Sequence, residues 1–163
     1  RRQRQMCIRD RGYIEKRKSE MNLPVDYIAV HIRRGDKIVS REMKELGLSL
    51  YIDAVKGKKH ISRNVFIATD DSSVKDELKS ILVAEGFNVY CNTAVTQTGF
   101  DESLFNTKDK KSRYIDTLNM LLDMDILIHS SFFIGTYTSN VSRIVPLYVG
   151  FGKSLSLDDE WKL

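Results

Sequence analysis

The run YIAVHIRRGDK, residues 27–37, contains the strongest structural signal in this chain. Its first six residues, Tyr27 to Ile32, are almost continuously apolar, which is typical of a short β-strand buried on both faces. Gly35 then lets the backbone turn. The run therefore predicts an inner strand of a parallel sheet whose exit carries five ionisable side chains: His31, Arg33, Arg34, Asp36 and Lys37.

Strands and helices are expected to alternate along the rest of the chain. Apolar runs that indicate further strands lie at residues 64–68, 87–90 and 132–135. Apolar side chains recur at helical spacing in residues 48–55, 74–82 and 113–124, whereas residues 92–106 are expected to form a polar loop. This alternation predicts an α/β fold, an open parallel sheet with helices on both faces.

Polar clusters follow three of the predicted strands, at residues 31–37, 69–72 and 136–140. The carboxyl ends of parallel strands share one edge of the sheet, and ligands of open α/β sheets bind outside that edge. The three clusters are therefore expected to meet there.

Two of these clusters suit an anion. An arginine guanidinium binds phosphate oxygens in pairs, and successive strand residues point to opposite faces, so one of Arg33 and Arg34 is expected to bind ligand while the other pairs with Asp36 or another acid. Residues 136–140 (TYTSN) open a predicted helix, whose first amides favour negative charge. Together the clusters predict a clamp for a diphosphate. The chain has no P-loop lysine motif and no GxGxxG fingerprint, which argues against a P-loop nucleotidase or a dinucleotide enzyme.

Charge and composition exclude other classes. The net charge is +4, but residues 1–18 alone hold eight basic and two acidic residues, which leaves the remainder slightly acidic and argues against a nucleic-acid partner. No apolar run in the sequence is long enough for a membrane segment. Asp123 and Asp125 form a DxD pair, but they lie in a predicted helix and face different directions, so no metal is expected.

Four segments together resemble the eukaryotic α1,6-fucosyltransferases of glycosyltransferase family 23, which modify the core of N-glycans. The segments are VHIRRGDK (30–37), FIATDDSS (66–73), FIGTYTSNVSR (133–143) and SLDDEW (156–161), and rhizobial chitin-oligosaccharide fucosyltransferases share the arginine motif. The resemblance implies the Rossmann-like, nucleotide-sugar-binding half of a GT-B-like glycosyltransferase. It also implies an inverting, metal-independent transfer, with no cofactor, of fucose from GDP-β-L-fucose to the 6-hydroxyl of a GlcNAc residue.

The resemblance also implies roles for single residues. Arg33 would bind the β-phosphate with Ser139, and His31 and Asp123 would recognise guanine; Asp123 keeps the family's spacing to the serine better than Asp116 does. The general base would be Glu42, although the gap that separates it from Lys37 is one residue longer than in the family. The catalytic set is thus Glu42, Lys37 and Arg33, and the substrate-binding set is His31, Arg33, Arg34, Asp36, Tyr51, Asp70, Asp71, Asp123 and Ser139.

Departures from the family limit these expectations. The family's amino-terminal half and its carboxy-terminal SH3-like domain are absent, so we expect a fragment that binds GDP but is inactive alone. The family's cysteine in the fourth strand is Gly135 here, and residues 1–11, which resemble translated adapter sequence, are expected to be non-native or disordered, with the domain formed by residues 12–163.

Compartment and assembly are not determined by the sequence. A eukaryotic parent would be a type II protein of the Golgi lumen and a bacterial one cytoplasmic, and a homodimer would form through regions outside this sequence. Two other functions remain open: a glycosyltransferase with another nucleotide donor, and a non-catalytic nucleotide- or sugar-binding module.

Overall fold

A parallel β-sheet forms the centre of the computed structural model, which describes residues 2–34, 46–94, 96 and 99–161, with side chains from residue 10 onward. Within these residues five strands pair in the order β3-β2-β1-β4-β5, and every pairing is parallel. The strands are β1 (Ile28–Ile32), β2 (Asn64–Thr69), β3 (Asn88–Cys91), β4 (Phe132–Gly135) and β5 (Ser154–Ser156).

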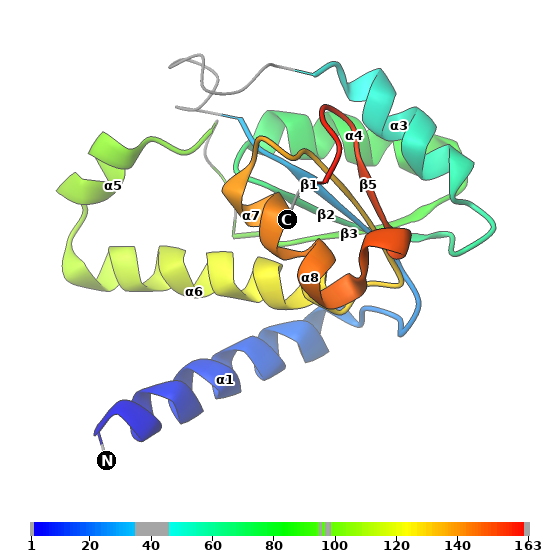
Figure 1. Ribbon diagram of the computed structural model, residues 1–163. Coiled ribbons are helices and arrows are strands. Elements are labelled where there is room, and N and C mark those ends of the chain that lie inside the picture. Colours follow the sequence, from blue (N-terminus) through cyan, green and yellow to red (C-terminus); the bar gives the residue numbers. More distant parts are fainter. Residues whose placement is uncertain (1, 35–45, 95, 97–98, 162–163) are drawn as a thin grey trace.

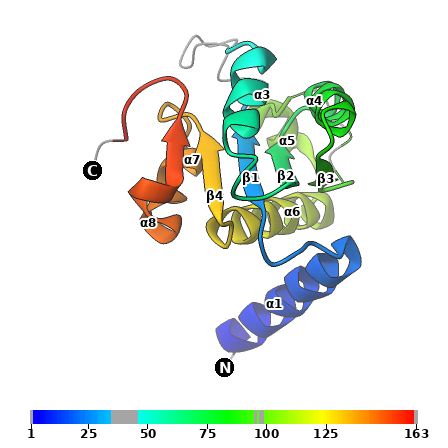
Figure 2. The same ribbon diagram turned by 90° about the vertical axis from the view of Figure 1, so that its right-hand side faces the viewer.

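Helices cover both faces of the sheet, as the sequence predicted (Figure 1). Helices α3 (Leu48–Gly57) and α4 (Ser72–Ala84) pack on one face, and α6 (Lys110–Ile128) packs on the other with α1 (Arg2–Met21) beneath it. In Figure 2, which shows the strands side by side from β5 to β3, α7 (Asn140–Ile144) and α8 (Pro146–Val149) lie beside β4 and β5. The remaining elements are the short helix α5 (Glu102–Thr107) and the 3-10 turn η1 (Phe151–Lys153).

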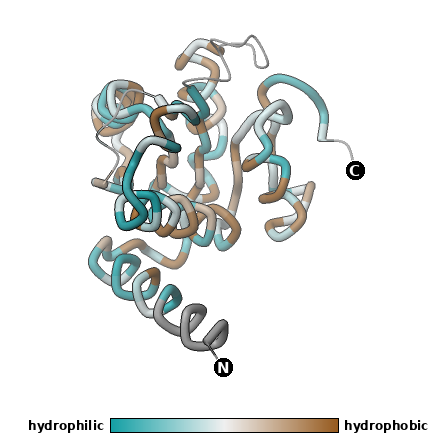
Figure 3. Tube along the Cα trace, turned by 90° about the vertical axis from the view of Figure 1, so that its left-hand side faces the viewer, coloured by the Kyte–Doolittle hydropathy of each residue, from teal (hydrophilic) through white to brown (hydrophobic). Residues whose placement is uncertain are grey.

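The central strand β1 is buried along its whole length. Ile28, Val30 and Ile32 pack toward α3 and α4, and Ala29 packs toward α6. This alternation follows from the period of two in a strand, since successive side chains point to opposite faces. Figure 3 shows hydrophobic colour along strands inside the fold and hydrophilic colour on much of the outside.

Most predicted elements are confirmed, and four short ones in the described residues were not predicted: α5, α8, η1 and β5. Helix α5 lies inside the region expected to be a polar loop. It begins because the Asp101 carboxylate accepts hydrogen bonds from the backbone N–H groups of Ser103 (2.8 Å) and Leu104 (3.1 Å). Strand β5 is only three residues long, too short for a period-two pattern to reveal.

The parallel register brings the polar clusters to one edge. Because β2 and β4 both pair with β1, the residues after Ile32, Thr69 and Gly135 leave the sheet side by side. Residues after Ser156 in β5 emerge at that edge too. No helix in the described part of the chain is both long enough and apolar enough to span a bilayer. The backbone of residues 2–11 is described as part of α1, and the expectation that residues 1–11 are non-native or disordered stays a prediction.

Candidate ligand site at the carboxyl edge of the sheet

The two arginines after β1 point into different surroundings. Arg34 is buried, with 7% of its surface exposed, and its Nη2 donates a hydrogen bond to the backbone carbonyl of Leu46 (2.8 Å). The side chain of Arg33 is 21% exposed and therefore reaches solvent. Of the two, Arg33 is the guanidinium that an incoming anion can reach.

Asp70 connects three segments of this edge. Its Oδ1 accepts a hydrogen bond from the backbone N–H of Arg34 (2.7 Å), and its Oδ2 accepts one from the backbone N–H of Phe100 (3.0 Å). The same Oδ2 lies 3.2 Å from Nη1 of Arg33. The carboxylate therefore holds Arg33 and Arg34, the described start of the arginine loop, in place, and protein donors already engage both of its oxygens.

The aromatic ring of Phe100 forms the other support of Arg33. The Arg33 guanidinium carbon lies 4.9 Å from the centre of the Phe100 ring, a cation–π distance. Phe100 in turn packs against Phe105 of α5, with 5.6 Å between ring centres. The Arg33 guanidinium is thus oriented by an ion pair and by a ring while it stays partly open to solvent.

The next residue, Asp71, begins helix α4. Its Oδ1 accepts hydrogen bonds from the Ser73 backbone N–H (2.9 Å), the Ser73 hydroxyl (2.6 Å) and the Val74 backbone N–H (3.3 Å). Burial alone would raise the pKa of this carboxyl, but the hydrogen bonds and the nearby Arg34 charge lower it below its ordinary value. Asp71 therefore acts as an N-cap in this structure.

On the β4 side of the edge, the loop 136–139 presents hydroxyl groups. Ser139 is the N-cap residue of α7 and is 3% exposed, and among the described residues its hydroxyl makes no capping hydrogen bond. Thr136 is 2% exposed, and its hydroxyl has no partner in the described part of the chain. Helix α7 has only five residues, so the partial positive charge at its start is smaller than that of the longer helix the sequence led us to expect.

Below this loop, His31 is buried on the face of the sheet that α6 and α7 cover. Its Nδ1 lies 2.7 Å from the hydroxyl oxygen of Ser142 on α7. Burial, helped by the Arg33 charge, lowers the pKa of His31 to about 3, so the ring is neutral at physiological pH. The contact ties β1 to α7 and so fixes the spacing between the arginine loop and the loop 136–139.

Asp123 lies on α6, next to the end of β3. Its Oδ1 accepts a hydrogen bond from Nδ2 of Asn92 (3.2 Å), and Asn92 is 1% exposed. Burial raises the pKa of the Asp123 carboxyl to about 7, although the Asn92 hydrogen bond lowers it. In the described residues no group of three or more His, Cys, Asp or Glu is placed to hold a metal ion.

The sequence family described as alpha-(1,6)-fucosyltransferase N- and catalytic domains matches residues 5–147, which is most of the chain. The chain belongs to this family. No curated protein matches it.

Solved fucosyltransferase structures share the fold of this family member. NodZ α-1,6-fucosyltransferase co-crystallised with GDP superposes with a TM-score of 0.58 at 20% identity, over 86% of this chain and 41% of that one. The fucosyltransferase NodZ from Bradyrhizobium gives 0.57 at 21% identity over 86% and 42%. POFUT1 in complex with GDP gives 0.59 at 16% identity over 91% and 46%. The chain spans less than half the length of these proteins, and identities this low establish the fold alone.

The fucosyltransferase-family fold brings together most of the predicted site residues that are described. Arg33, Asp70, Asp71 and Ser139 line the carboxyl edge, while Arg34 and Tyr51 lie just inside it; Tyr51 is 2% exposed, and burial raises its pKa to about 12. Asp36, Lys37 and Glu42 lie outside the described residues. The roles assigned to all of these residues stay predictions.

Three further residues at this edge were not found from the sequence: Phe100, Asn92 and Asp158. Each contacts a partner that is distant in the sequence: Phe100 contacts Arg33, Asn92 contacts Asp123, and Asp158 contacts the loop 136–139. For Asp158 a signal did exist, because SLDDEW was among the segments that carry the family resemblance and no role had been given to it.

Proposed function

We propose that this chain is the donor-binding part of a fucosyltransferase and binds GDP-fucose at the carboxyl edge of the sheet. The observation that carries the proposal is that Arg33 and Ser139, which match the family's phosphate-binding positions, lie beyond the carboxyl ends of two paired strands. Family membership and the partly exposed, oriented guanidinium of Arg33 support it. NodZ and POFUT1, which share the fold, were crystallised with GDP or GDP-fucose.

In the proposed reaction a new bond forms between the acceptor's hydroxyl oxygen and C1 of fucose as the bond from C1 to the β-phosphate oxygen of GDP breaks. Glu42 takes the proton of the acceptor hydroxyl while that bond forms. The departing GDP gains negative charge, which Arg33 stabilises together with the Ser139 hydroxyl. Attack from the side opposite the departing GDP inverts the configuration at C1.

The acceptor we propose is a GlcNAc 6-hydroxyl of an N-glycan core or a chitin oligosaccharide. His31 and Asp123 are the proposed guanine contacts, since a carboxylate can accept hydrogen bonds from both N1 and N2 of guanine. Because Arg33 stabilises the GDP charge without a metal, transfer is expected to continue in EDTA.

Calorimetric titration of the chain with GDP tests the donor site. We expect GDP to bind more tightly than ADP or UDP, and Arg33→Ala to weaken GDP binding by about ten- to a hundredfold, the value of a charge-assisted phosphate contact. Arg63→Ala is the matched control, because Arg63 is exposed and precedes β2 at the opposite edge of the sheet. Equal loss in both variants, or no GDP binding by the wild type, would refute the site.

A transfer assay with GDP-fucose and a GlcNAc oligosaccharide tests the reaction, in the longer protein expected from the family resemblance. Glu42→Gln is expected to abolish transfer while GDP binding survives. Full transfer by this variant would show that Glu42 is not the base. GDP binding with no transfer by the wild type would instead favour a non-catalytic binding module.

A further inference from the structure

The carboxylate of Asp158 binds the loop that follows β4. Its Oδ1 accepts a hydrogen bond from the backbone N–H of Tyr137 (2.6 Å), and its Oδ2 accepts hydrogen bonds from the backbone N–H (3.1 Å) and the hydroxyl (2.5 Å) of Thr138. The two carboxylate oxygens thus accept hydrogen bonds from two successive residues. This bidentate contact restrains the backbone immediately before Ser139.

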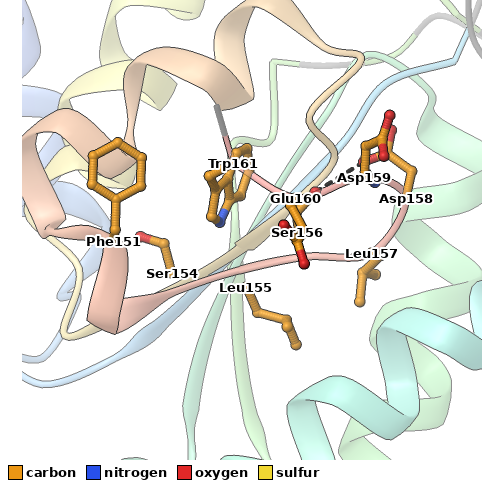
Figure 4. Close-up of a pocket in the computed structure, with 9 residues that line it drawn as sticks. All are labelled: Phe151, Ser154, Leu155, Ser156, Leu157, Asp158, Asp159, Glu160 and Trp161. Atoms are coloured by element: carbon orange, nitrogen blue, oxygen red, sulfur yellow. Dashed lines mark hydrogen bonds between the residues drawn. The ribbon is translucent and has the colours of Figure 1, made fainter. Parts of the chain in front are cut away.

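Its own segment holds Asp158 in place for this contact. Its Oδ1 also accepts hydrogen bonds from the Ser156 hydroxyl (2.9 Å) and the Asp159 backbone N–H (2.8 Å). The Leu157 backbone N–H donates to the Gly135 carbonyl (3.0 Å), which continues the pairing of β5 with β4. In Figure 4 Asp158 lies where the segment turns back after Leu157, and a dashed line marks a hydrogen bond at this turn.

The charge of Asp158 also reaches the other side of the site. Together with burial, which has the larger effect, it raises the pKa of Tyr51 on α3. Burial would raise the pKa of Asp158 itself, but the hydrogen bonds from Thr138, Asp159 and Ser156 lower it below its ordinary value. The group is therefore an anion at physiological pH, and as an anion it is unsuited to contact a diphosphate directly.

We propose that Asp158 is a positioning residue that holds the loop 136–139 so that the Ser139 hydroxyl faces the diphosphate of the donor. This inference rests on the proposed donor site. Asp158 occupies the amides of Tyr137 and Thr138 and leaves the Ser139 hydroxyl for the ligand. Without Asp158 the loop has to be ordered when GDP binds, and ordering the backbone of a single residue is enough to weaken binding about tenfold.

The test compares GDP affinity in the full chain and in three variants: Asp158→Ala, Asp158→Asn and Glu160→Gln. We expect Asp158→Ala to weaken GDP binding about tenfold, because ordering is then required. Asp158→Asn keeps one acceptor oxygen and is expected to lose about threefold, as a partial rescue. Glu160 is an exposed acid in the same segment, and Glu160→Gln, which removes the same charge, is expected to bind GDP like the wild type.

Amide resonances of Tyr137 and Thr138 in the ligand-free chain provide a readout that general destabilisation would not move. Both are expected to shift in the Asp158 variants, while the amides of the buried strand β1 and the thermal midpoint stay close to wild type. If Asp158→Ala does not fold, Asp158→Asn carries the same comparison. Wild-type affinity in the folded Asp158 variants, or tighter binding once the charge is removed, would overturn the inference. If the wild type itself does not bind GDP, the donor site on which the inference rests is refuted instead.

Discussion

At the scale of single residues, Gly135 at the end of β4 has no room for a side chain. A Cβ atom there would lie 2.6 Å from Cζ of Phe133 and 2.8 Å from the hydroxyl oxygen of Ser142. Ser142 is the partner of His31, so a clash would also disturb the contact between β1 and α7. The glycine where the family has a cysteine is therefore matched to its surroundings in this chain.

Gly135→Ala is expected to destabilise the protein by about 1–3 kcal/mol, the usual cost of overpacking a core. Urea unfolding measures this change. Gly57→Ala is the control, because a Cβ at Gly57 in α3 meets no atom within 4 Å, and it is expected to be neutral or stabilising by about 0.5 kcal/mol. Similar losses in both variants would contradict the steric explanation.

Asp123 predicts a pH dependence. Its pKa is raised from 3.8 to about 7, so the folded protein holds a proton there that the unfolded chain has already lost. The stability from this proton is complete below pH 3.8 and disappears as the pH rises through about 7. Between pH 5 and pH 8 the wild type is therefore expected to lose roughly 2 kcal/mol relative to Asp123→Asn.

Denaturant unfolding of both proteins at the two pH values measures the difference, and comparing variants cancels the contribution of His31. Asp116→Asn is the control on the same helix, because the Asp116 carboxylate is partly exposed and ion-paired with Lys108 (2.7 Å). Its effect is expected to stay below about 1 kcal/mol at either pH. An Asp123→Asn difference that does not change with pH would show that the wild-type carboxylate is charged throughout.

At the scale of elements, Asp71 at the start of α4 has one observed role, as the N-cap, and one predicted role, as a substrate contact. Two substitutions distinguish these roles. Loss of the N-cap in Asp71→Ala is expected to cost about 1 kcal/mol of unfolding free energy. Asp71→Ser keeps a capping oxygen without the charge and is expected to restore most of that stability. Calorimetric titration of both variants with GDP then shows whether the carboxylate has a role beyond the cap. If it binds substrate, as predicted from the family, Asp71→Ser will be stable but weak in GDP binding.

Elements were predicted from the sequence wherever burial imposed a regular pattern. The strand β1 is buried on both faces, so it is continuously apolar, and α4 shows helical spacing because one side packs on the sheet. Helix α5 has no buried residue, so no apolar pattern revealed it; its cap, Asp101, was the only local signal.

At the scale of the whole molecule, the packing of α1 tests where the domain begins. Ile14 and Met21 of α1 pack against the core on the α6 side. Lys18 forms an ion pair with Asp125 of α6 (2.7 Å). Within residues 1–11 only the side chains of Asp10 and Arg11 are described, and Asp10 accepts a hydrogen bond from the Tyr114 hydroxyl (2.5 Å) in an exposed contact.

If residues 1–11 are non-native, as expected from the sequence, a chain that starts at residue 12 has a free energy of unfolding within about 1 kcal/mol of the full chain, because the exposed contact of Asp10 contributes little. A chain that starts at residue 22 also loses the apolar contacts of α1 and is expected to be about 2 kcal/mol less stable. Thermal unfolding compares the three chains. A large loss on removing residues 1–11 alone would show that they belong to the domain.

The sequence by itself determined the longer strands and helices, that the sheet is parallel, and that its polar clusters meet at one edge. These features follow from local periodicity and from the rule that parallel strands end on the same side. The tertiary structure alone decided that Arg33 faces solvent between Asp70 and Phe100, and that Asp158 holds the loop before Ser139. Such contacts join residues far apart in the chain. Periodicity shows which face a side chain occupies, whereas its partner depends on how separate elements pack.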